Sequence, residues 1–497
     1  HLWAPEVTYS STYHRYYLVY VVTDVADASR PEPGCHNDSA IGVATSTSPT
    51  GPWTAQPTPA VAPRSNGPCN YFWTFDPDVL GDVVGTNSIL YFGSYYGGIF
   101  ARPLTLTATG ATTSPPDTQI TIANRYEGAN VVQRNGYYYL FASATDCCKG
   151  PLTGYSVFAG RSTNPLGPFV DREGVSLLAG RVGGTPVLSM NGNKWVGTGH
   201  NSVFRDWSGQ WWTMYHAVNR FDPYFAGSVG FTRRPPLLDP VDWVGGWPTV
   251  RDGNWASSTP MPGPAAQPGT TTAYSPHRVR PDRRGSALPA ASDEFGGTSL
   301  DPKWSWVRPP DPATYGVEGG TFRFDTQAAD LYVDSNTASV LTEAAPSGDY
   351  MVTTRVKLNV PAEGCCFNFV QAGMVVYGGD DNFIKLAHVS IWETRQTEFA
   401  KELSPVPTGY PRYGNTVVGP PSDWTYLRVV KRSVAAAGHG GDTESYTGYS
   451  STDGTHWIRG GTWTHKLGSG ARIGLVSMGG SGFVANFDYV RVNRLAN

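Results

Sequence analysis

The 497-residue chain has few charged residues and no long apolar run. Lys, Arg, Asp and Glu together make up 15% of it, and the formal net charge is −3. This balance gives no electrostatic footprint for nucleic acid or for an anionic membrane. No stretch of 18 apolar residues occurs, so the sequence predicts no membrane-spanning helix. The opening HLWAPEVTYS has no initiator Met, charged leader or apolar signal core, as expected for a secreted protein whose export signal has been removed.

Cysteine is scarce, and its spacing is not that of a metal site. The six cysteines include no Cys-x-x-Cys pair, and an even count without such spacing favours disulfides and an oxidising compartment. We interpret Cys35–Cys69 as a loop staple. The adjacent pairs Cys147–Cys148 and Cys365–Cys366 are either vicinal disulfides or reduced buried thiols, and the vicinal bond is favoured at Cys147–Cys148.

Aromatic residues, glycine and proline are abundant. Aromatic residues make up 13% of the chain, with 58 Gly and 40 Pro, a profile typical of short strands joined by tight turns. Aromatic strands recur at 16–20, 89–96, 137–143 and 211–217. The segments IGVATSTSPTGPW and VFAGRSTNPLGPF both read as a strand, a polar turn and Gly-Pro-aromatic. Units of roughly 60–70 residues suit four-stranded propeller blades, so the sequence predicts a β-propeller domain over 1–257.

The amino-acid composition changes after the fourth unit. Residues 258–291 are rich in Pro, Ala, Ser and Thr and lack periodicity, which indicates a linker. The basic run HRVRPDRR (277–284) within it reads as a solvated or docking stretch. Alternating strands over 292–497 predict a β-sandwich. The run 379–382 (GDDN) is either a hairpin turn or a calcium-binding loop.

Each propeller unit begins with a short segment that carries one unusual polar residue. These are WAPEV with Glu6, TFDPDV with Asp76, YEGANVV with Glu127 and TGHNSVF with His200. Because the innermost strand of each blade lines the axis, we expect the four side chains to converge near one end of the channel. Two such carboxylates are what glycoside hydrolysis requires. His200 is either a buried core histidine or the ligand of a cation whose other positions are filled by water.

Aromatic residues flank these axial positions. Trp3, Trp73 and Tyr126 could stack on sugar rings, or could belong to the β-core. We also place Glu6 and the Cys147–Cys148 pair among the expected substrate contacts.

The order WAPEV, TFDPDV, YEGANVV and GHNSV resembles glycoside hydrolase family 43, the five-bladed propeller enzymes that cleave arabinose- and xylose-containing glycans. NGYYYLFASATDCCKGPLTGYSVFAGRS is similar to the arabinanase and arabinofuranosidase branch, and FDYVRV with QAGMVVYGGDDNFIKL is similar to an appended concanavalin-type sandwich. The resemblance implies that Glu127 is the general acid and that Asp76 raises the pKa of this acid and orients it. It also implies an inverting reaction and a metal, commonly calcium, at His200, with no organic cofactor.

One expected residue has no match. The family's general base is an Asp in an Asp-Pro motif on the first blade, and no segment of this sequence matches it. Glu6 is no substitute, since its family counterpart is not catalytic. The resemblance therefore predicts that His1 begins the second blade, with the first blade in a preceding segment, in another chain or lacking.

The resemblance predicts a glycosidase acting on α-L-arabinofuranosyl linkages in arabinan or a related polysaccharide. We expect the protein to be secreted and monomeric. β-Xylosidase and β-galactofuranosidase activities remain open, because pocket loops choose the sugar. If the base is truly missing, the alternative is a non-catalytic carbohydrate-binding propeller. We expect no nucleic-acid or membrane partner.

Overall fold

The protein is built from β-strands. The computed structural model describes residues 1–25, 38–84 and 87–496. Within this part of the chain there is no α-helix, and the short 3-10 helices are η1 (Gly150–Leu152), η2 (Arg251–Gly253), η3 (Pro289–Ala291) and η4 (Pro312–Thr314). The abundant Gly and Pro residues explain this, because they favour turns and interrupt helices. The predicted all-β class is confirmed.

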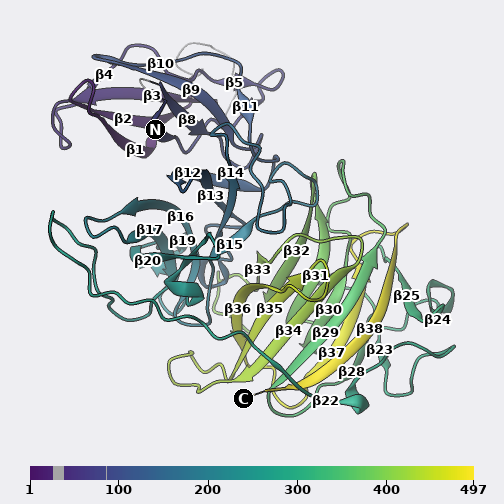
Figure 1. Cartoon of the computed structure of the whole chain (residues 1–497). Coiled ribbons are helices and arrows are strands. Elements are labelled where there is room, and N and C mark those ends of the chain that lie inside the picture. The colour runs from purple at the N-terminus through teal and green to yellow at the C-terminus, as the bar shows by residue number, and fades with distance from the viewer. Residues whose placement is uncertain (26–37, 85–86, 497) are drawn as a thin grey trace. The chain divides into compact units, whose positions relative to one another are not determined.

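Four small antiparallel sheets of propeller type follow one another in the N-terminal half (Figure 1). The first has the order β1 (Leu2–Ser10), β2 (Arg15–Thr23), β3 (Ser39–Ser46), β4 (Thr54–Ala55). The second runs β10 (Gly110–Thr113), β9 (Phe100–Thr107), β8 (Asn87–Phe92), β7 (Asp78–Val84), with β11 (Thr118–Gln119) on β9. The third has the order β12 (Tyr126–Arg134), β13 (Tyr137–Ala144), β14 (Ser156–Ser162), β15 (Thr185–Leu188). The fourth has the order β16 (Trp195–Arg205), β17 (Trp211–Asn219), β20 (Pro236–Val244), β21 (Trp247–Val250).

Alternating side chains fix the faces of these strands. In β2, Tyr17, Val19 and Val21 are buried while the residues between them are partly exposed, because successive side chains of a strand point to opposite faces. The buried face packs with Ile41 and Val43 of β3 in one hydrophobic cluster that also includes residues of β7, β8 and β9. The period-2 pattern in the sequence therefore corresponds to one buried and one more exposed face of the strand.

Each predicted axial residue lies in, or just before, the first strand of its unit. β1, β7, β12 and β16 each stand at one end of the strand order of their sheet. Glu6 lies within β1, Glu127 is the second residue of β12 and His200 lies within β16, whereas Asp76 stands two residues before β7. The four segments thus occupy equivalent places in the four sheets, as the repeat analysis predicts.

Two short ribbons accompany these sheets and a third belongs to the C-terminal half. They are β5 (Arg64–Ser65) with β6 (Tyr71–Phe72), β18 (Tyr224–Phe225) with β19 (Ser228–Thr232), and β26 (Leu331–Tyr332) with β27 (Ser335–Asn336).

The C-terminal half is a sandwich of two antiparallel sheets. One has the order β24 (Tyr315–Glu318), β25 (Thr321–Asp325), β38 (Val484–Leu495), β29 (Tyr350–Leu358), β34 (Thr425–Ser433), β35 (Glu444–Ser451), β36 (Ile458–His465), with β22 (Arg284–Ala287) on β38. The other has the order β23 (Ser305–Val307), β28 (Val340–Ala344), β37 (Arg472–Met478), β30 (Gln371–Gly379), β31 (Asn382–Ile391), β32 (Thr394–Glu402), β33 (Tyr413–Val417). The predicted β-sandwich is confirmed.

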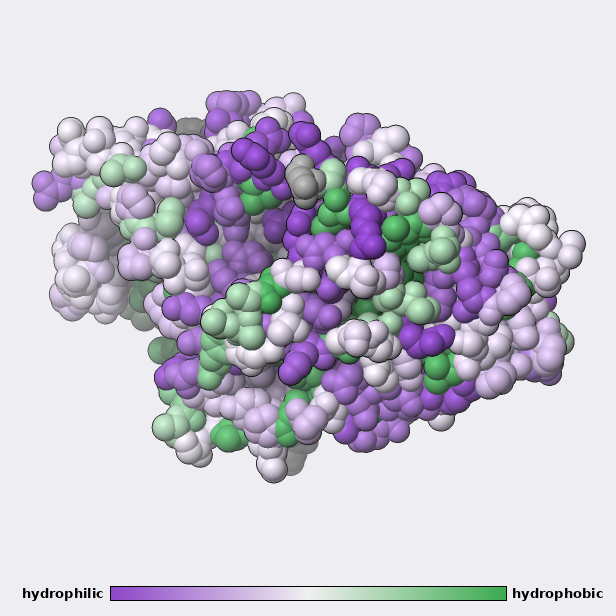
Figure 2. Space-filling model, turned by 90° about the horizontal axis from the view of Figure 1, so that it is seen from below, coloured by the Kyte–Doolittle hydropathy of each residue, from purple (hydrophilic) through white to green (hydrophobic). Residues whose placement is uncertain are grey.

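Among the described residues, no helix has the length and apolar character needed to cross a membrane. The face in Figure 2 interleaves hydrophilic and hydrophobic residues, as is normal for a folded protein surface.

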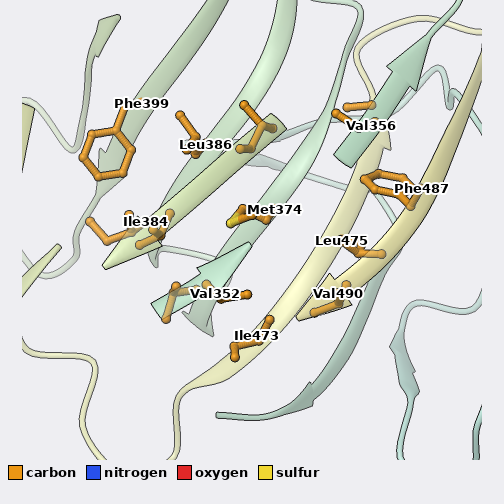
Figure 3. Packing of buried hydrophobic residues seen from close by; sticks show 14 of the residues in the cluster. Val352, Val356, Met374, Ile384, Leu386, Phe399, Ile473, Leu475, Phe487 and Val490 are labelled. Atoms are coloured by element: carbon orange, nitrogen blue, oxygen red, sulfur yellow. The ribbon is translucent and has the colours of Figure 1, made fainter. Parts of the chain in front are cut away.

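The core of the sandwich lies between its two sheets (Figure 3). Val352, Val356, Phe487 and Val490 come from β29 and β38 of one sheet. The facing sheet contributes Met374, Ile384, Leu386, Phe399, Ile473 and Leu475. Burying each of these side chains stabilises the fold by roughly 1.5–3 kcal/mol before chain entropy is subtracted.

The segment expected to be a linker is partly ordered on the sandwich. Residues 258–283 contain no strand or helix. Arg284–Ala287, however, forms β22 on β38, with Arg284 opposite Leu495, and η3 follows directly. A short strand at a sheet edge lacks the length for a periodic signal, so the sequence did not reveal it.

By contacts, the chain divides into two compact units. The first comprises His1–Ser143, Phe158–Leu178 and His200–Phe204, and the second comprises Ala144–Val157, Ala179–Gly199 and Arg205–Asn497. Glu6, Asp76, Glu127 and His200 therefore all belong to the first unit, and the whole sandwich belongs to the second.

Candidate active site

Asp76 is tied to the strand that carries Glu127. The backbone N–H of Gly128 donates to Oδ2 of Asp76 at 3.2 Å. Asp76 itself has a positive φ of 50° and is followed by Pro77, and its side chain is only 11% exposed. A carboxylate held in this way fixes the backbone beside Glu127, so the two predicted carboxylate positions are brought together.

Glu127 is oriented by a neighbouring hydroxyl. The Oγ atom of Ser94, just after β8, donates to Oε2 of Glu127 at 3.0 Å. The residue after it, Gly128, has a φ of 62°, a region that glycine adopts without the cost that a Cβ would bring. This turn of the backbone lets a second element approach closely.

That second element is His200. A Cβ built on Gly128 would lie 3.2 Å from Cγ and Nδ1 of His200, and Nε2 of His200 lies 4.0 Å from Oδ1 of Asp76. The backbone N–H of His200 donates to Oγ of Ser143 at 2.8 Å. Its side chain is 41% exposed, which excludes the buried-core interpretation that the sequence left open.

Two of the residues that meet here have a strained backbone. Asp76 and His200 both have positive φ, at 50° and 48°. A non-glycine residue there costs on the order of 1–3 kcal/mol, and such residues tend to gather at functional sites. Asp76 and His200 both lie next to the segment that carries the Glu127 carboxylate, and they mark this region as a candidate site.

Asp78 and Glu6 form a second pair of acidic residues, besides Asp76 and Glu127. Asp78, at the start of β7, is buried, and it accepts hydrogen bonds from Nδ2 of Asn130 and from the N–H of Val131, each at 2.8 Å. Burial raises its pKa to about 7, and the two hydrogen bonds oppose that rise. Burial, and then the proximity of Asp78, raises the pKa of Glu6 to about 8. Below about pH 7 this pair is therefore mostly protonated and contributes little negative charge.

Sequence reasoning missed Asp78 and Asn130. Asn130 donates to Asp78 of β7, and its Oδ1 accepts the N–H of Val203 in β16 at 2.9 Å. One amide in β12 thereby links three neighbouring sheets close to the site. The alternation in FDPDV was the available signal for Asp78, whereas nothing local marks Asn130.

The aromatic residues predicted to contact substrate differ in their exposure. Trp3 is 50% exposed and lies edge-on to Phe75, with ring centroids 5.0 Å apart, while Trp73 stacks on the same ring at 5.5 Å. Phe75, whose ring contacts both indoles, was not predicted. A partly exposed indole can offer a face to a sugar ring, so substrate contact by Trp3 and Trp73 stays a prediction.

Tyr126 does not suit the predicted role. Its side chain is fully buried, and its ring lies against Phe158 at 6.3 Å and beneath the guanidinium of Arg125 at 5.0 Å. A ring without an exposed face cannot stack on a sugar, so the expectation of sugar stacking was wrong. Tyr126 packs inside the third sheet because its aromatic ring fills the core at the start of β12.

The cysteines are oxidised where they are described. Cys147–Cys148 and Cys365–Cys366 both form vicinal disulfides, which confirms that interpretation over reduced thiols. Cys69 is disulfide-bonded, but its predicted partner Cys35 lies outside the described residues. Cys148 is anchored by Asp146, which accepts its N–H at 2.9 Å. Whether Cys147 and Cys148 touch substrate stays a prediction.

The described residues do not assemble a cage for a metal ion. No group of three or more His, Cys, Asp or Glu side chains within them is placed to hold one. The carboxylate of Asp76 lies 4.0 Å from Nε2 of His200. Calcium at His200 stays a prediction.

The run at 379–382 is a turn. It joins β30 to β31, and the carboxylate of Asp380 is occupied by a two-pronged pair with Arg308 at 2.8 and 2.9 Å and by the hydroxyl of Tyr377 at 2.7 Å. These protein donors occupy the carboxylate oxygens that a cation would need. The run is therefore a hairpin turn and not a calcium-binding loop.

Comparison with known proteins identifies the family. Residues 1–248 match glycosyl hydrolases family 43. The arabinan endo-1,5-α-L-arabinosidase C of Emericella nidulans is 32% identical over 259 residues, which cover 50% of this chain and 74% of that protein. The chain belongs to glycoside hydrolase family 43.

A further relative and a solved structure are also similar to this chain. The extracellular endo-α-(1→5)-L-arabinanase 1 of Bacillus subtilis is 32% identical over 254 residues, covering 50% of this chain and 68% of that protein. The crystal structure of a family 43 endo-arabinanase from Bacillus licheniformis is 30% identical, covers 50% of this chain and 77% of that one, and gives a TM-score of 0.41. Residues 292–493 match the β-xylosidase C-terminal concanavalin A-like domain. The resemblance predicted from the motifs is thus confirmed for both halves of this family 43 member.

Proposed function

We propose that this family 43 glycosidase hydrolyses α-L-arabinofuranosyl linkages of arabinan with inversion. The carrying observation is the 32% identity of its N-terminal half to two curated endo-arabinanases. Its substrate is then a polysaccharide. The oxidised cysteine pairs, and the extracellular location in the name of one relative, support a secreted protein.

Glu127 is the general acid in this proposal. In an inverting hydrolysis the acid protonates the leaving oxygen while a carboxylate removes a proton from the water that attacks the anomeric carbon. The hydrogen bond from Ser94 orients the Glu127 carboxyl. The base is not assigned to any residue of this sequence.

Asp76 is a positioning residue. It holds the Gly128 N–H next to Glu127, and its negative charge raises the pKa of a nearby carboxylic acid. Asp76→Asn keeps an oxygen acceptor and removes the charge. The alkaline limb of the pH–rate profile should therefore move to lower pH, whereas a purely structural role would lower the rate at every pH alike.

The test compares the wild type with Glu127→Gln on linear arabinan and on p-nitrophenyl α-L-arabinofuranoside. Loss of a general acid lowers the rate by about 10²–10⁴-fold. The loss should be larger on arabinan, because its leaving alcohol needs a proton more than nitrophenolate does. Equal rates for the two proteins would reject the assignment of Glu127, and a wild type that binds arabinan without cleaving it would favour a carbohydrate-binding propeller.

A β-xylosidase is the second candidate. The match of residues 292–493 to a β-xylosidase C-terminal domain favours it. Rates on p-nitrophenyl β-D-xylopyranoside and on the arabinofuranoside, measured with the same preparation, separate the two activities, and NMR of the first-formed anomer tests inversion.

A further inference from the structure

The basic run at 277–284 is docked on the sandwich by its backbone and by one aspartate. The carboxylate of Asp282 accepts hydrogen bonds from Arg432 of β34 and from the hydroxyl of Tyr449 of β35, each at 2.5 Å. The backbone N–H of Val279 donates to the carbonyl of Asp252 at 3.2 Å, and the carbonyl of Arg283 accepts the N–H of Ala496 at 3.0 Å. The backbone is thus fixed, while the side chains of Arg278, Arg280 and Arg283 remain exposed.

Two pockets adjoin along this run, and they share Arg280 and Pro281. Their volumes are about 570 and 910 Å³. Arginines of the run and arginines of the sandwich line them together. We name this pair of pockets the arginine groove, and its arginines are Arg278, Arg280, Arg283, Arg428, Arg432, Arg459 and Arg494.

The arginine groove has a large excess of positive charge. Seven arginines and two aspartates line it. Asp282 is engaged by Arg432, and Asp349 accepts the backbone N–H of Ser433 at 2.7 Å. Within the described part of the chain, Arg278, Arg280 and Arg283 form no ion pair with a carboxylate. The overall charge of −3 conceals this patch because it averages over the whole chain.

One of these arginines is buried and forms no ion pair within the described residues, although the charge of Asp282 acts on it. Arg428 is only 7% exposed. Its Nε donates to Oγ1 of Thr353 at 3.3 Å, and its guanidinium lies 3.4 Å from the ring centre of Trp457. Burial, and then the charge of Arg284, lowers its pKa to about 10, although nearby groups that include Asp282 oppose the shift. A buried cation is costly, and an anion entering the pocket would offset part of that cost.

We propose that the arginine groove binds a polysaccharide that carries carboxylate groups. Guanidinium groups form two-pronged hydrogen bonds with carboxylates, and two adjoining pockets suit an anion that repeats along a chain better than a single small anion. Trp457, which is only partly buried, also lines the groove, and aromatic rings pack against sugars. The sandwich would thereby hold an acidic glycan with residues other than the predicted catalytic ones.

The test measures binding of the full chain to polygalacturonate, to neutral dextran and to duplex DNA of matched total charge. Arg280→Ala/Arg283→Ala removes the arginine shared by both pockets and its neighbour. We expect its affinity for polygalacturonate to be about tenfold lower than that of the wild type, since each lost guanidinium removes a charge-assisted contact. The matched control Arg205→Ala/Lys357→Ala removes two exposed positive charges that line neither pocket and should bind like the wild type.

Salt and polymer type complete the design. Raising NaCl from about 0.05 M to about 0.5 M should weaken wild-type binding through screening, and dextran should not bind. Equal affinities of the wild type and Arg280→Ala/Arg283→Ala would overturn the proposal, and so would tighter binding to DNA than to polygalacturonate. Because the readout is binding, a failure of the proposed arabinan hydrolysis would leave this result unchanged.

Discussion

Replacing Glu6 by Gln should remove a pH dependence of stability that the folded protein acquires by burying this carboxyl. Glu6 lies in β1 and is partly buried. Burial, and then the nearby Asp78, raises its pKa from 4.5 to about 8. Gln has nearly the same shape and cannot ionise, so the substitution isolates the cost of charging this position.

The sign and the size follow from the two pKa values. Between about pH 4.5 and 8 the unfolded chain has released the Glu6 proton while the folded chain retains it. The stability conferred by the raised pKa is therefore fully present below about 4.5 and is lost as pH rises through about 8. A shift from 4.5 to about 8 corresponds to roughly 4–5 kcal/mol as an upper limit. Asp78, with a pKa raised to about 7, adds a change in the same direction.

The assay is urea unfolding followed by tryptophan fluorescence across this pH range. At about pH 4.5 the wild type and Glu6→Gln should be equally stable, and near pH 8 the variant should be more stable by about 2–5 kcal/mol. Asp24→Asn, at an exposed position after β2, is the control and should follow the wild type. Parallel stability curves for the wild type and Glu6→Gln would refute the reasoning.

Two further predictions concern the strand that carries the general acid. Gly128→Ala places a Cβ 3.2 Å from the ring of His200 at a φ of 62°. Activity should therefore fall at least about tenfold, with a loss of only about 1 kcal/mol of unfolding free energy. An unchanged kcat/KM would contradict a role for this close approach. Asn130→Ala leaves the Asp78 carboxyl without one hydrogen-bond donor and the N–H of Val203 without its acceptor. This loss should cost about 2–5 kcal/mol of unfolding free energy. A change below about 0.5 kcal/mol, measured by chemical denaturation, would speak against the bridge between sheets.

The fold class was predictable because strand patterns are local. The alternation in β2 and the repeat of Gly-Pro-aromatic segments need no knowledge of distant residues, and they gave four units and a sandwich correctly. β22 escaped notice because four residues at a sheet edge carry no period. Its pairing with β38 depends on a strand some two hundred residues away in the chain.

The candidate site was predictable in its members but not in its surroundings. Repeat-equivalent positions pointed to Asp76, Glu127 and His200, which the fold brings to one place. The same reasoning placed Tyr126 against substrate, yet its ring is buried against Phe158. Whether an aromatic side chain faces the core or the solvent depends on what packs over it, and no local pattern records that.

The sequence by itself determined the strands, the two-part architecture and the family, because hydrophobic alternation and spaced motifs are properties of the chain alone. Only the tertiary structure decided that Asp78 and Glu6 are buried together with raised pKa values, that Asn130 joins three sheets, and that a basic run meets the arginines of a distant sandwich. Charge, burial and hydrogen bonding are set by neighbours in space, and folding supplies those neighbours from parts of the chain that have no common pattern.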